Sequence, residues 1–326
     1  MISAPIAIIF GISGQDGAYL AQLLLEKGYE VHGVSRDAEN VSFERLVRLG
    51  IKESVILHSG NLGEFRSVVS LMDKINPSEI YNLAGQSSVS LSFELPVETF
   101  SSVAIGNLNI LEYLRLRRGN IRLFQAISSE CFGNTSSRVD ETSAFNPRSP
   151  YALAKAASFW ANSIYREAYG IYVSSGILSN HESPLRHGRF VSRKIVSTAV
   201  RISRGSTEKL LLGDMEVARD WGWAPEYVDA IWRILQMDAA DDYVIATGET
   251  HYLYEFVEAV FLELGLDWRE HVEMSDSLRR PSEVMRIELD PTKAEEKLGW
   301  VASSKMREVA AHLVRYEISG DHDPLP

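Results

Sequence analysis

IAIIFGISGQDG, residues 6–17, is the stretch that decides the fold of this 326-residue chain. Its apolar, mostly β-branched start, Ile6–Phe10, predicts a buried strand. Gly11, Gly14 and Gly17 follow in a GxxGxxG spacing and open a helical pattern, Gly17–Lys27. Glycines in such a turn let backbone amides approach a pyrophosphate, which the helix N-terminus stabilises. The stretch therefore predicts a dinucleotide site, against the alternative of a glycine turn that serves only helix–strand packing.

Short apolar runs alternate with helical patterns through the first half of the chain. This alternation predicts βαβ units and an α/β fold of Rossmann type, with a doubly wound parallel sheet. Ligands of such sheets lie outside the carboxyl ends of the strands, so we expect function there. The other predicted strands are Val31–Ser35, Val55–His58, Ile80–Ala84, Leu123–Ile127 and Val173–Leu178, and the longest predicted helices are Pro96–Arg117 and Pro150–Tyr169.

The pattern loosens after Leu178, where longer loops separate the helices. We expect a smaller C-terminal substrate-binding domain there, and a return of the chain to the sheet at Tyr243–Thr247. The predicted division is 1–178 for the cofactor-binding Rossmann domain, with a return around 219–250, and 179–218 with 251–326 for the substrate-binding domain. The predicted loops are Asn180–Arg189, Asp214–Trp223 and Ser275–Met285.

The composition of the chain indicates its cellular compartment and excludes some classes of binding partner. A formal net charge of −11 indicates no basic surface for nucleic acid. No apolar stretch approaches the roughly 20 residues of a membrane span, and the N-terminal MISAPIAIIFG lacks the basic start of a signal peptide. The single cysteine, Cys131, excludes an intrachain disulfide and fits a reducing compartment. We expect a cytoplasmic enzyme with a small-molecule partner.

No metal site is predicted. One cysteine cannot form a Cys-cluster site. His181-Glu182 also lacks the second histidine of the zinc motif HExxH, because residue 185 is leucine.

The end of the second strand bears on the choice of cofactor. An acidic residue there usually binds the ribose 2′-hydroxyl of NAD, whereas this chain has Ser35-Arg36. A hydroxyl and a guanidinium suit the 2′-phosphate of NADP, which we favour. Asp37 leaves NAD open, because it can neutralise Arg36 or reach the ribose itself.

Tyr151 and Lys155 lie four residues apart in a predicted helix, and so on one face. An ammonium and the positive charge of a nicotinamide favour the phenolate, so that the tyrosine can act as a base near neutral pH. The same spacing also occurs in ordinary helices. The glycine turn and the strand end Ser128-Ser129-Glu130 favour the catalytic interpretation.

With these features the chain resembles the extended short-chain dehydrogenase/reductases, and within them the GDP-mannose 4,6-dehydratase family. The resemblance runs from about Ile6 to Trp300, with NHESP, RDWG and RPSEV as its most specific pieces. The segments that carry it are GISGQDG (11–17), QAISSECFG (125–133), RSPYALAK (148–155), GILSNHESP (176–184), RDWG (219–222), YVIATG (243–248) and RPSEV (280–284).

The resemblance implies a redox-neutral dehydration of GDP-mannose to GDP-4-keto-6-deoxymannose with tightly bound NADP. Tyr151 would take the proton of the sugar 4-hydroxyl, with Lys155 on the cofactor ribose and Ser128 on the same oxygen. The family usually has Thr at position 128, and Ser keeps the hydroxyl. Glu130 would remove the proton on carbon 5 as water leaves carbon 6. The alternative is a structural role, in which Glu130 caps a turn or pairs with Arg148.

The resemblance also implies the binding residues. The cofactor-binding set is Gly11, Ser13, Gly14, Gln15, Asp16, Gly17, Arg36, Asn61, Leu62, Gln86, Tyr151 and Lys155. The substrate-binding set is Asn180, Glu182, Lys194, Arg219, Arg280 and Glu283, with Arg219, Arg280 and Glu283 expected in loops. Arginine suits a diphosphate because its planar fork binds two oxygens at once.

Departures from the family pattern keep alternatives open. Asp37 replaces the second of two arginines in a loop that also joins subunits in the family, and Asn61 replaces an Asp that faces adenine. His187, Ala218 and Met285 differ from the family in the expected sugar region, so GDP-heptose stays an alternative substrate. A reductase or epimerase of the same fold is another alternative, although these commonly lack a carboxylate at position 130.

The two long helices predict a homodimer or homotetramer. Both helices carry apolar residues on more than one face, and the sheet can cover only one face of each helix. The residues that suggest this are Ile110, Leu111, Tyr113, Leu114, Phe159, Trp160 and Ile164.

Overall fold

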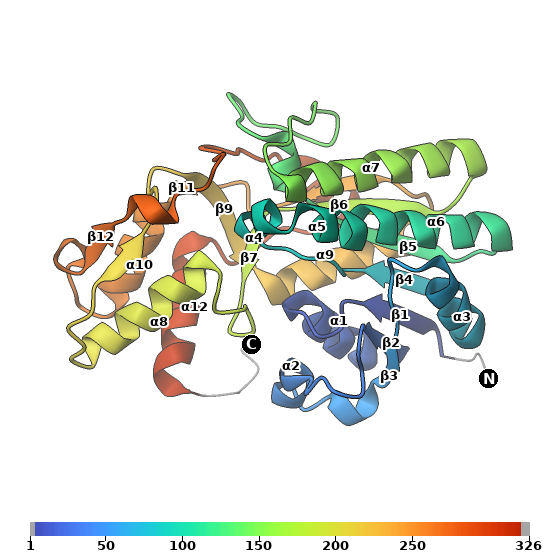
Figure 1. Cartoon of the computed structure of the whole chain (residues 1–326), viewed down its shortest axis with the longest axis horizontal. Helices are drawn as coiled ribbons and strands as arrows, with labels where there is room; N and C mark the ends of the chain where they lie inside the picture. Colours follow the sequence, from blue (N-terminus) through green and yellow to red (C-terminus); the bar gives the residue numbers. More distant parts are fainter. Residues whose placement is uncertain (1–3, 321–326) are drawn as a thin grey trace.

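A seven-stranded parallel sheet forms the centre of the computed structural model, which describes residues 4–320 (Figure 1). The strand order is β10-β6-β5-β4-β1-β2-β3, and every neighbouring pair is parallel. This confirms the doubly wound α/β fold. The strands are β1 Ile6–Phe10, β2 Glu30–Ser35, β3 Ile56–Ser59, β4 Glu79–Asn82, β5 Arg122–Ser128, β6 Val173–Leu178 and β10 Asp242–Ile245.

Helices cover both faces of the sheet because successive strand side chains point to opposite faces. In β1, Ala7 and Ile9 pack in one core cluster, whereas Ile8 and Phe10 pack in another. Figure 1 shows α6 and α7 above the sheet and α1 and α9 below it. The helices around the sheet are α1 Gln15–Glu26, α2 Glu44–Arg48, α3 Phe65–Ile75, α4 Val89–Glu94, α5 Pro96–Phe100, α6 Gly106–Arg117, α7 Pro150–Tyr169, α9 Ala224–Gln236 and α11 Thr292–Leu298.

The predicted helix Pro96–Arg117 is interrupted. A π-helical segment, Ser101–Ile105, joins α5 to α6. A π turn inserts one residue into an otherwise continuous helix, and the apolar periodicity of a sequence does not reveal it. Within α6, Gly106 lies against Leu62, whose Cβ would be 3.1 Å from an added Cβ.

Two of the predicted loops contain strands, which corrects the sequence analysis. β7 Asn180–Glu182 and β9 Ala218–Trp223 pair in parallel, and β11 Thr250–Tyr252 adds to β9 antiparallel. All six residues of β9 are buried. A strand buried on both faces has no polar–apolar alternation, so the pattern ARDWGW did not indicate one.

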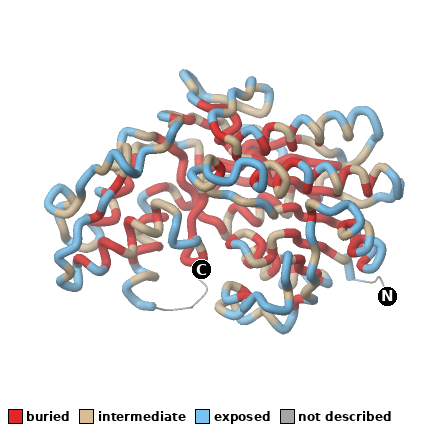
Figure 2. Tube along the Cα trace, viewed as in Figure 1, coloured by how far each residue is buried: buried red, intermediate tan, exposed pale blue. Residues whose placement is uncertain are grey.

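The remaining elements pack around their own core cluster, at the left of Figure 1. They are α8 Val191–Ser203, β8 Leu210–Leu212, α10 Leu253–Glu263, β12 Val272–Met274 and α12 Met306–Ser319. Figure 2 shows buried residues running through this group and through the central sheet. Residues 1–3 and 321–326, the outer ends of the predicted domains, lie outside the described residues, and the division into two domains stays a prediction.

Short 3₁₀ helices complete the described elements, at Lys52–Ser54, Ser129–Phe132, Trp268–Glu270 and Asp276–Leu278. Between residues 4 and 320, no helix is long and apolar enough to cross a membrane.

Candidate active site

Strand β5 ends at Ser128, and the 3₁₀ turn that follows carries Glu130 into the interior. The Ser128 hydroxyl accepts a hydrogen bond from the Glu130 amide at 3.3 Å, which fixes the turn. Glu130 is only 8% exposed. A buried carboxylate needs a partner, and its partner decides what it can do.

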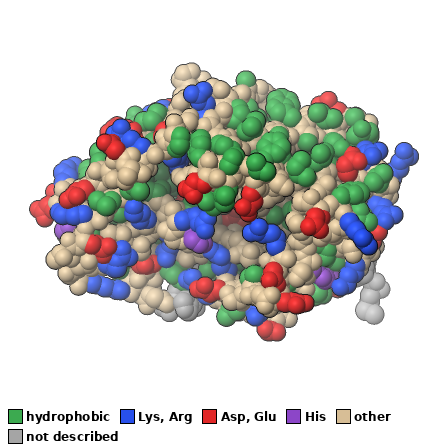
Figure 3. All heavy atoms as spheres, viewed as in Figure 1, with side chains coloured by type: hydrophobic (Ala, Val, Ile, Leu, Met, Phe, Trp, Pro, Cys, Tyr) green, Lys and Arg blue, Asp and Glu red, His purple; other side chains and the backbone are tan. Residues whose placement is uncertain are grey.

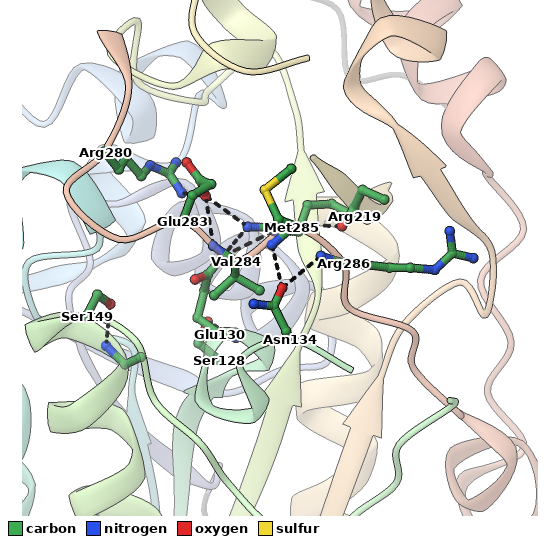
Figure 4. Close-up of polar contacts among 12 residues, drawn as sticks. Ser128, Glu130, Asn134, Ser149, Arg219, Arg280, Glu283, Val284, Met285 and Arg286 are labelled. Carbon is green, nitrogen blue, oxygen red and sulfur yellow. Dashed lines mark hydrogen bonds and ion pairs between the residues drawn. The ribbon is translucent and has the colours of Figure 1, made fainter. Parts of the chain in front are cut away.

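That partner is Arg219, and not Arg148, which the sequence analysis gave as one alternative. Arg219 Nε donates to Glu130 Oε1 at 3.2 Å, although Arg219 belongs to β9 of the three-stranded sheet (Figure 4). The guanidinium is buried, so water screens the pair little. The contact holds the candidate carbon-5 base in one orientation.

The same arginine leads to the RPSEV segment. Arg219 Nη2 lies 3.4 Å from Glu283 Oε1, and Arg280 Nη1 lies 3.0 Å from the same oxygen. Figure 4 shows Glu130, Arg219, Glu283 and Arg280 converging from three segments. The structure thus brings three of the six predicted substrate residues together with Glu130. Arg219 is in a strand rather than in the predicted loop.

The backbone of this segment is fixed on both sides. The amide of Met285 donates to Asn134 Oδ1 at 2.6 Å, and the Met285 carbonyl accepts from the Ala218 amide at 2.6 Å. Residues 283–286 therefore lie between β9 and the chain that follows Glu130 (Figure 4). Ala218 and Met285, two of the residues that the sequence analysis singled out in the expected sugar region, are in direct contact here.

Helix α7 supplies Tyr151 and Lys155, both buried. The Ser149 hydroxyl caps the helix by accepting from the Ala152 amide at 3.1 Å, and Pro150 follows at the first helical position. Lys155 Nζ donates to the Ala126 carbonyl at 2.7 Å and lies 5.9 Å from the centre of the Tyr151 ring.

Burial dominates the ionisation of this pair. It lowers the pKa of Lys155 to about 8, while Asp16 and Cys131 act to raise it. Burial also raises the pKa of Tyr151 well above its ordinary value, although a hydrogen bond with the Ser128 hydroxyl lowers it. The expected preference for the phenolate is therefore not supplied by the chain alone. A bound cationic nicotinamide beside the phenol is the kind of group that would supply it.

Gly11, Gly14 and Gly17, the three glycines of the turn before α1, have different structural roles. A Cβ on Gly11 would lie 2.8 Å from the Leu83 carbonyl carbon, and one on Gly17 would lie 2.3 Å from the Gly11 carbonyl oxygen. Gly11 also has φ of +89°, which favours glycine. A Cβ on Gly14 would meet only the Gly11 oxygen, at 3.1 Å. Gly11 and Gly17 are thus required by packing, whereas Gly14 leaves room at the N-terminus of α1 for a ligand to approach.

The side chains of Gln15 and Asp16, predicted at the cofactor, are bound within the protein. Gln15 Oε1 accepts from the Ser183 hydroxyl at 2.7 Å, and Gln15 Nε2 donates to the His181 carbonyl at 3.1 Å. Asp16 Oδ2 pairs with His181 Nε2 at 3.0 Å. Only the backbone of these residues is left for a cofactor. The sequence analysis missed His181 and Ser183, because it considered His181 only as a metal ligand.

Arg36 and Asp37, after β2, face different partners. The Arg36 side chain is 81% exposed, and its guanidinium forms a long ion pair, 3.5 Å, with Glu98. Asp37 instead accepts from the Asn40 amide and side chain, at 3.1 and 2.9 Å. These hydrogen bonds lower the pKa of the fully exposed Asp37. Asp37 is thus engaged in a local turn and does not pair with Arg36.

The other predicted cofactor residues lie at neighbouring strand ends. Asn61 follows β3 and accepts from the Gly63 amide at 3.0 Å, so its side chain closes a turn. Leu62 is buried in the core, and its carbonyl accepts from Asn109 at 2.7 Å. Gln86 follows β4 and donates to the Ser88 carbonyl at 2.8 Å. All three lie beyond the carboxyl ends of their strands.

The remaining substrate residues lie elsewhere in the same half of the chain. Glu182 is 2% exposed, accepts from Ser192 at 2.5 Å and pairs with Arg186 at 3.4 Å. Lys194 donates to the Leu211 carbonyl at 2.6 Å, between α8 and β8. Asn180 lies opposite Trp221 in the β7–β9 pair. Glu182 thus has a structural contact of its own, apart from the Glu130–Arg219 cluster.

Comparison with known proteins bears on this arrangement. The family model described as GDP-mannose 4,6 dehydratase matches residues 8–313, which include every candidate residue above. The chain belongs to the GDP-mannose 4,6-dehydratase family. GDP-mannose 4,6 dehydratase 1 of Arabidopsis thaliana is 47% identical over 305 residues, covering 90% of this chain and 84% of that protein. The GDP-mannose 4,6-dehydratase of Sinorhizobium fredii is 40% identical, covering 98% of both.

Solved structures share the fold of this family member. A dTDP-glucose 4,6-dehydratase from Bacillus anthracis, in complex with NAD, superposes with a TM-score of 0.84 at 19% identity and covers 97% of both chains. In this GDP-mannose 4,6-dehydratase family member, no group of three or more His, Cys, Asp or Glu side chains in residues 4–320 is arranged to hold a metal ion.

Proposed function

We propose that this chain removes water from GDP-mannose to form GDP-4-keto-6-deoxymannose, with a nicotinamide cofactor at the glycine loop. Membership of the GDP-mannose 4,6-dehydratase family supports the reaction. The single observation that carries it is the buried carboxylate of Glu130, held by Arg219 beside the strand end that bears Ser128. Hydride transfer at carbon 4 alone does not require a base for the proton on carbon 5.

The residues divide the reaction between them. Tyr151 takes the proton of the sugar 4-hydroxyl, and Ser128 donates a hydrogen bond to the same oxygen. Once carbon 4 is a ketone, the proton on carbon 5 is acidic. Glu130 removes this proton and passes it to the hydroxide that leaves carbon 6, so that water departs. General acid–base steps of this kind each contribute roughly 10²–10⁴-fold. A nicotinamide held at the glycine turn Gly11–Gly17 would supply the redox chemistry, since it could take a hydride from carbon 4 and give it back at carbon 6.

The electrostatics of the site fit these roles. Burial disfavours a Tyr151 phenolate by raising its pKa, and the hydrogen bond with the Ser128 hydroxyl acts against that rise. The Ala126 carbonyl holds the Lys155 ammonium 5.9 Å from the centre of the Tyr151 ring. Arg219 holds the Glu130 carboxylate in one orientation through a buried contact of 3.2 Å. Neither group needs a metal ion to perform its step.

NADP is the proposed form of the cofactor. Arg36 is exposed after β2, while Asp37 is engaged with Asn40, so the guanidinium remains accessible to a 2′-phosphate. Arg36→Ala should weaken NADP binding by about 10- to 100-fold, the loss of one charged hydrogen bond, and change NAD binding little. Titration of the wild type and the variant with both cofactors measures this. Tighter binding of NAD than of NADP to the wild type would contradict the proposal.

Incubation with GDP-mannose tests the reaction, with mass spectrometry to detect a product lighter by one water. GDP-heptose is the second substrate to try, since Ala218 and Met285 meet in the expected sugar region. A thermal-shift comparison of GDP-, UDP- and dTDP-sugars checks the nucleotide. Preferential stabilisation by UDP or dTDP would move the chain to another nucleotide-sugar activity.

We also propose that the protein is a homo-oligomer, assembled through α5, α6 and α7. Figure 3 shows apolar side chains gathered over this face. A groove of about 720 Å³ lies there, lined mainly by apolar residues that include Phe93, Val97 and Leu153. Five of the seven residues that suggested an interface are buried in the core, however, and only Trp160 and Ile164 are exposed. A cytoplasmic location remains part of the proposal.

A further inference from the structure

His181 is a buried, charged residue that the proposed reaction does not use. It is the middle residue of β7, between Asn180 and Glu182. Because side chains alternate along a strand, His181 points to the opposite side from its two neighbours. On that side lies the N-terminus of α1, where His181 Nε2 pairs with Asp16 Oδ2 at 3.0 Å.

Every polar atom of the His181 ring is engaged. Nδ1 lies 2.7 Å from the Ser179 carbonyl oxygen, so it donates to it, and Nε2 donates to Asp16. Two donating ring nitrogens require the imidazolium form. Burial alone would lower the pKa of His181, but Asp16 outweighs it and raises the pKa above its ordinary value. Burial likewise acts to raise the pKa of Asp16, and the His181 charge holds it well below its usual range.

The contact is reinforced by neighbours on both sides of it. Gln15, next to Asp16, bonds the His181 carbonyl and the Ser183 hydroxyl. The N-terminal turn of α1 is thus bound to β7 and its exit by three contacts, two on His181 and one on Ser183.

A second set of contacts leads from His181 to β9. Its ring stacks on Tyr227, with centroids 4.7 Å apart and planes at 22°. The Tyr227 hydroxyl lies 2.6 Å from the Ser179 hydroxyl, which donates to Asp220 Oδ1 at 2.8 Å. Asp220 is the residue after Arg219 in β9. Buried contacts therefore connect the glycine turn with β9, the strand whose Arg219 pairs with Glu130.

We propose that His181 is a positioning residue, which through Asp16 holds the cofactor turn at the start of α1 in register with the substrate-side strands β7 and β9. Cofactor and substrate bind to different parts of the fold, and hydride transfer requires their reacting carbons to meet within a few tenths of an ångström of one distance. A rigid, fully bonded ion pair between the two parts sets that distance. The inference rests on the proposed cofactor site at the glycine turn.

Two variants remove the charge while keeping size and polarity. His181→Gln and Asp16→Asn should each weaken NADPH binding and lower kcat by about tenfold, the effect of one charged hydrogen bond. KM for GDP-mannose should change much less. The double variant should be little worse than either single one, because both remove the same contact. The matched control is Asp242→Asn, which breaks the ion pair with Arg166 at the far edge of the sheet.

The pH profile separates positioning from mere stability. The charged groups that face His181 are Asp16 from α1 and Arg186 from the turn after β7, and the aromatic ring of Tyr227 faces it from α9. Because the pKa of His181 is raised, the pair is complete at and below pH 6.5 and is lost as pH rises through that raised pKa. NADPH affinity should fall over that range. In Asp16→Asn the ion pair is absent at every pH, so this fall in affinity should disappear.

Hydrogen exchange of the chain without ligands provides a readout that does not depend on the proposed activity. Amides of residues 11–17 should exchange faster in His181→Gln and Asp16→Asn than in the wild type, and should be unchanged in Asp242→Asn. Equal exchange, NADPH affinity and kcat in His181→Gln and the wild type would overturn the proposal. A wild type that binds no nicotinamide cofactor would instead overturn the proposed function, whatever the exchange data show.

Discussion

At the scale of the residue, the chemistry of this family member depends on which partner a charged side chain finds. Glu130 and Arg219 are 89 positions apart in sequence, yet they form a buried pair at 3.2 Å. Asp37 and Arg36 are adjacent, yet Asp37 bonds Asn40 instead. Charges next to each other in sequence need not pair, since each backbone position sends its side chain in its own direction.

Glu130→Gln is the decisive residue-scale test, because it removes the proposed carbon-5 base with almost no change in shape. Turnover should fall by about 10²–10⁴-fold. The first hydride transfer does not need Glu130, so reduced cofactor should accumulate and be visible by its absorbance. Tyr151→Phe should abolish both the absorbance and the product.

Two controls accompany that experiment. Glu283→Gln removes the other carboxylate on Arg219, and should raise KM while leaving exchange at carbon 5 in place. Product made by the wild type in deuterium oxide should carry deuterium at carbon 5. Near-normal loss of water by Glu130→Gln would show that Glu130 is structural and that the base lies elsewhere.

At the scale of the element, helix α7 and strand β9 deliver the site. α7 begins with the Ser149 cap and Pro150, directly before Tyr151, so the helix start and the proposed catalytic tyrosine are one local structure. β9 is buried on both faces and carries Arg219 to Glu130. Precision at the site therefore depends on how firmly the ends of these two elements are held.

Ser149→Ala should lower the free energy of unfolding by about 1 kcal/mol, the usual value of an N-cap. The amide that loses its acceptor is that of the buried Ala152, one residue from Tyr151, so kcat should fall as well. Chemical denaturation and steady-state kinetics measure the two effects. Ser149→Thr keeps a capping hydroxyl and should restore both; loss of stability without any change in kcat would separate the cap from the position of Tyr151.

At the scale of the whole molecule, the site lies where two packed groups of elements meet. Strand β5 of the central sheet ends at Ser128, the turn after it carries Glu130, and α7, which covers that sheet, carries Tyr151. The smaller three-stranded sheet contributes Arg219. Contacts across this junction, above all Glu130–Arg219 and Asp16–His181, hold the two groups together. On the outside, α5 and α7 leave an apolar face with Val97 81% exposed.

Val97→Glu and Leu153→Glu should convert the proposed oligomer into monomers, because each places a carboxylate in an apolar contact where it has no partner. Light scattering at micromolar concentration measures the mass. Leu262→Glu is the matched control: Leu262 is 74% exposed on α10, away from this face, and its replacement should leave the mass unchanged. A monomeric wild type would refute the assembly.

The sequence by itself determined the parallel sheet, the glycine turn and the Tyr151–Lys155 helix. Each follows from a local rule: an apolar run of strand length, a glycine spacing, and residues four apart on one helix face. The long helix at Pro150–Tyr169 was predicted at its observed bounds for the same reason. The resemblance added the family, which the comparisons confirm.

Only the tertiary structure decided the partners of the charged residues. Nothing in the sequence indicates that Glu130 meets Arg219, or that Asp16 meets His181 across 165 positions, because these pairings arise from how sheets and helices pack. The tertiary structure also showed that β9 is a strand. The sequence did not indicate this, because burial on both faces removes the polar–apolar alternation by which strands are recognised. Local periodicity specifies elements, whereas the burial of charge, which requires a partner at one place in space, specifies the site.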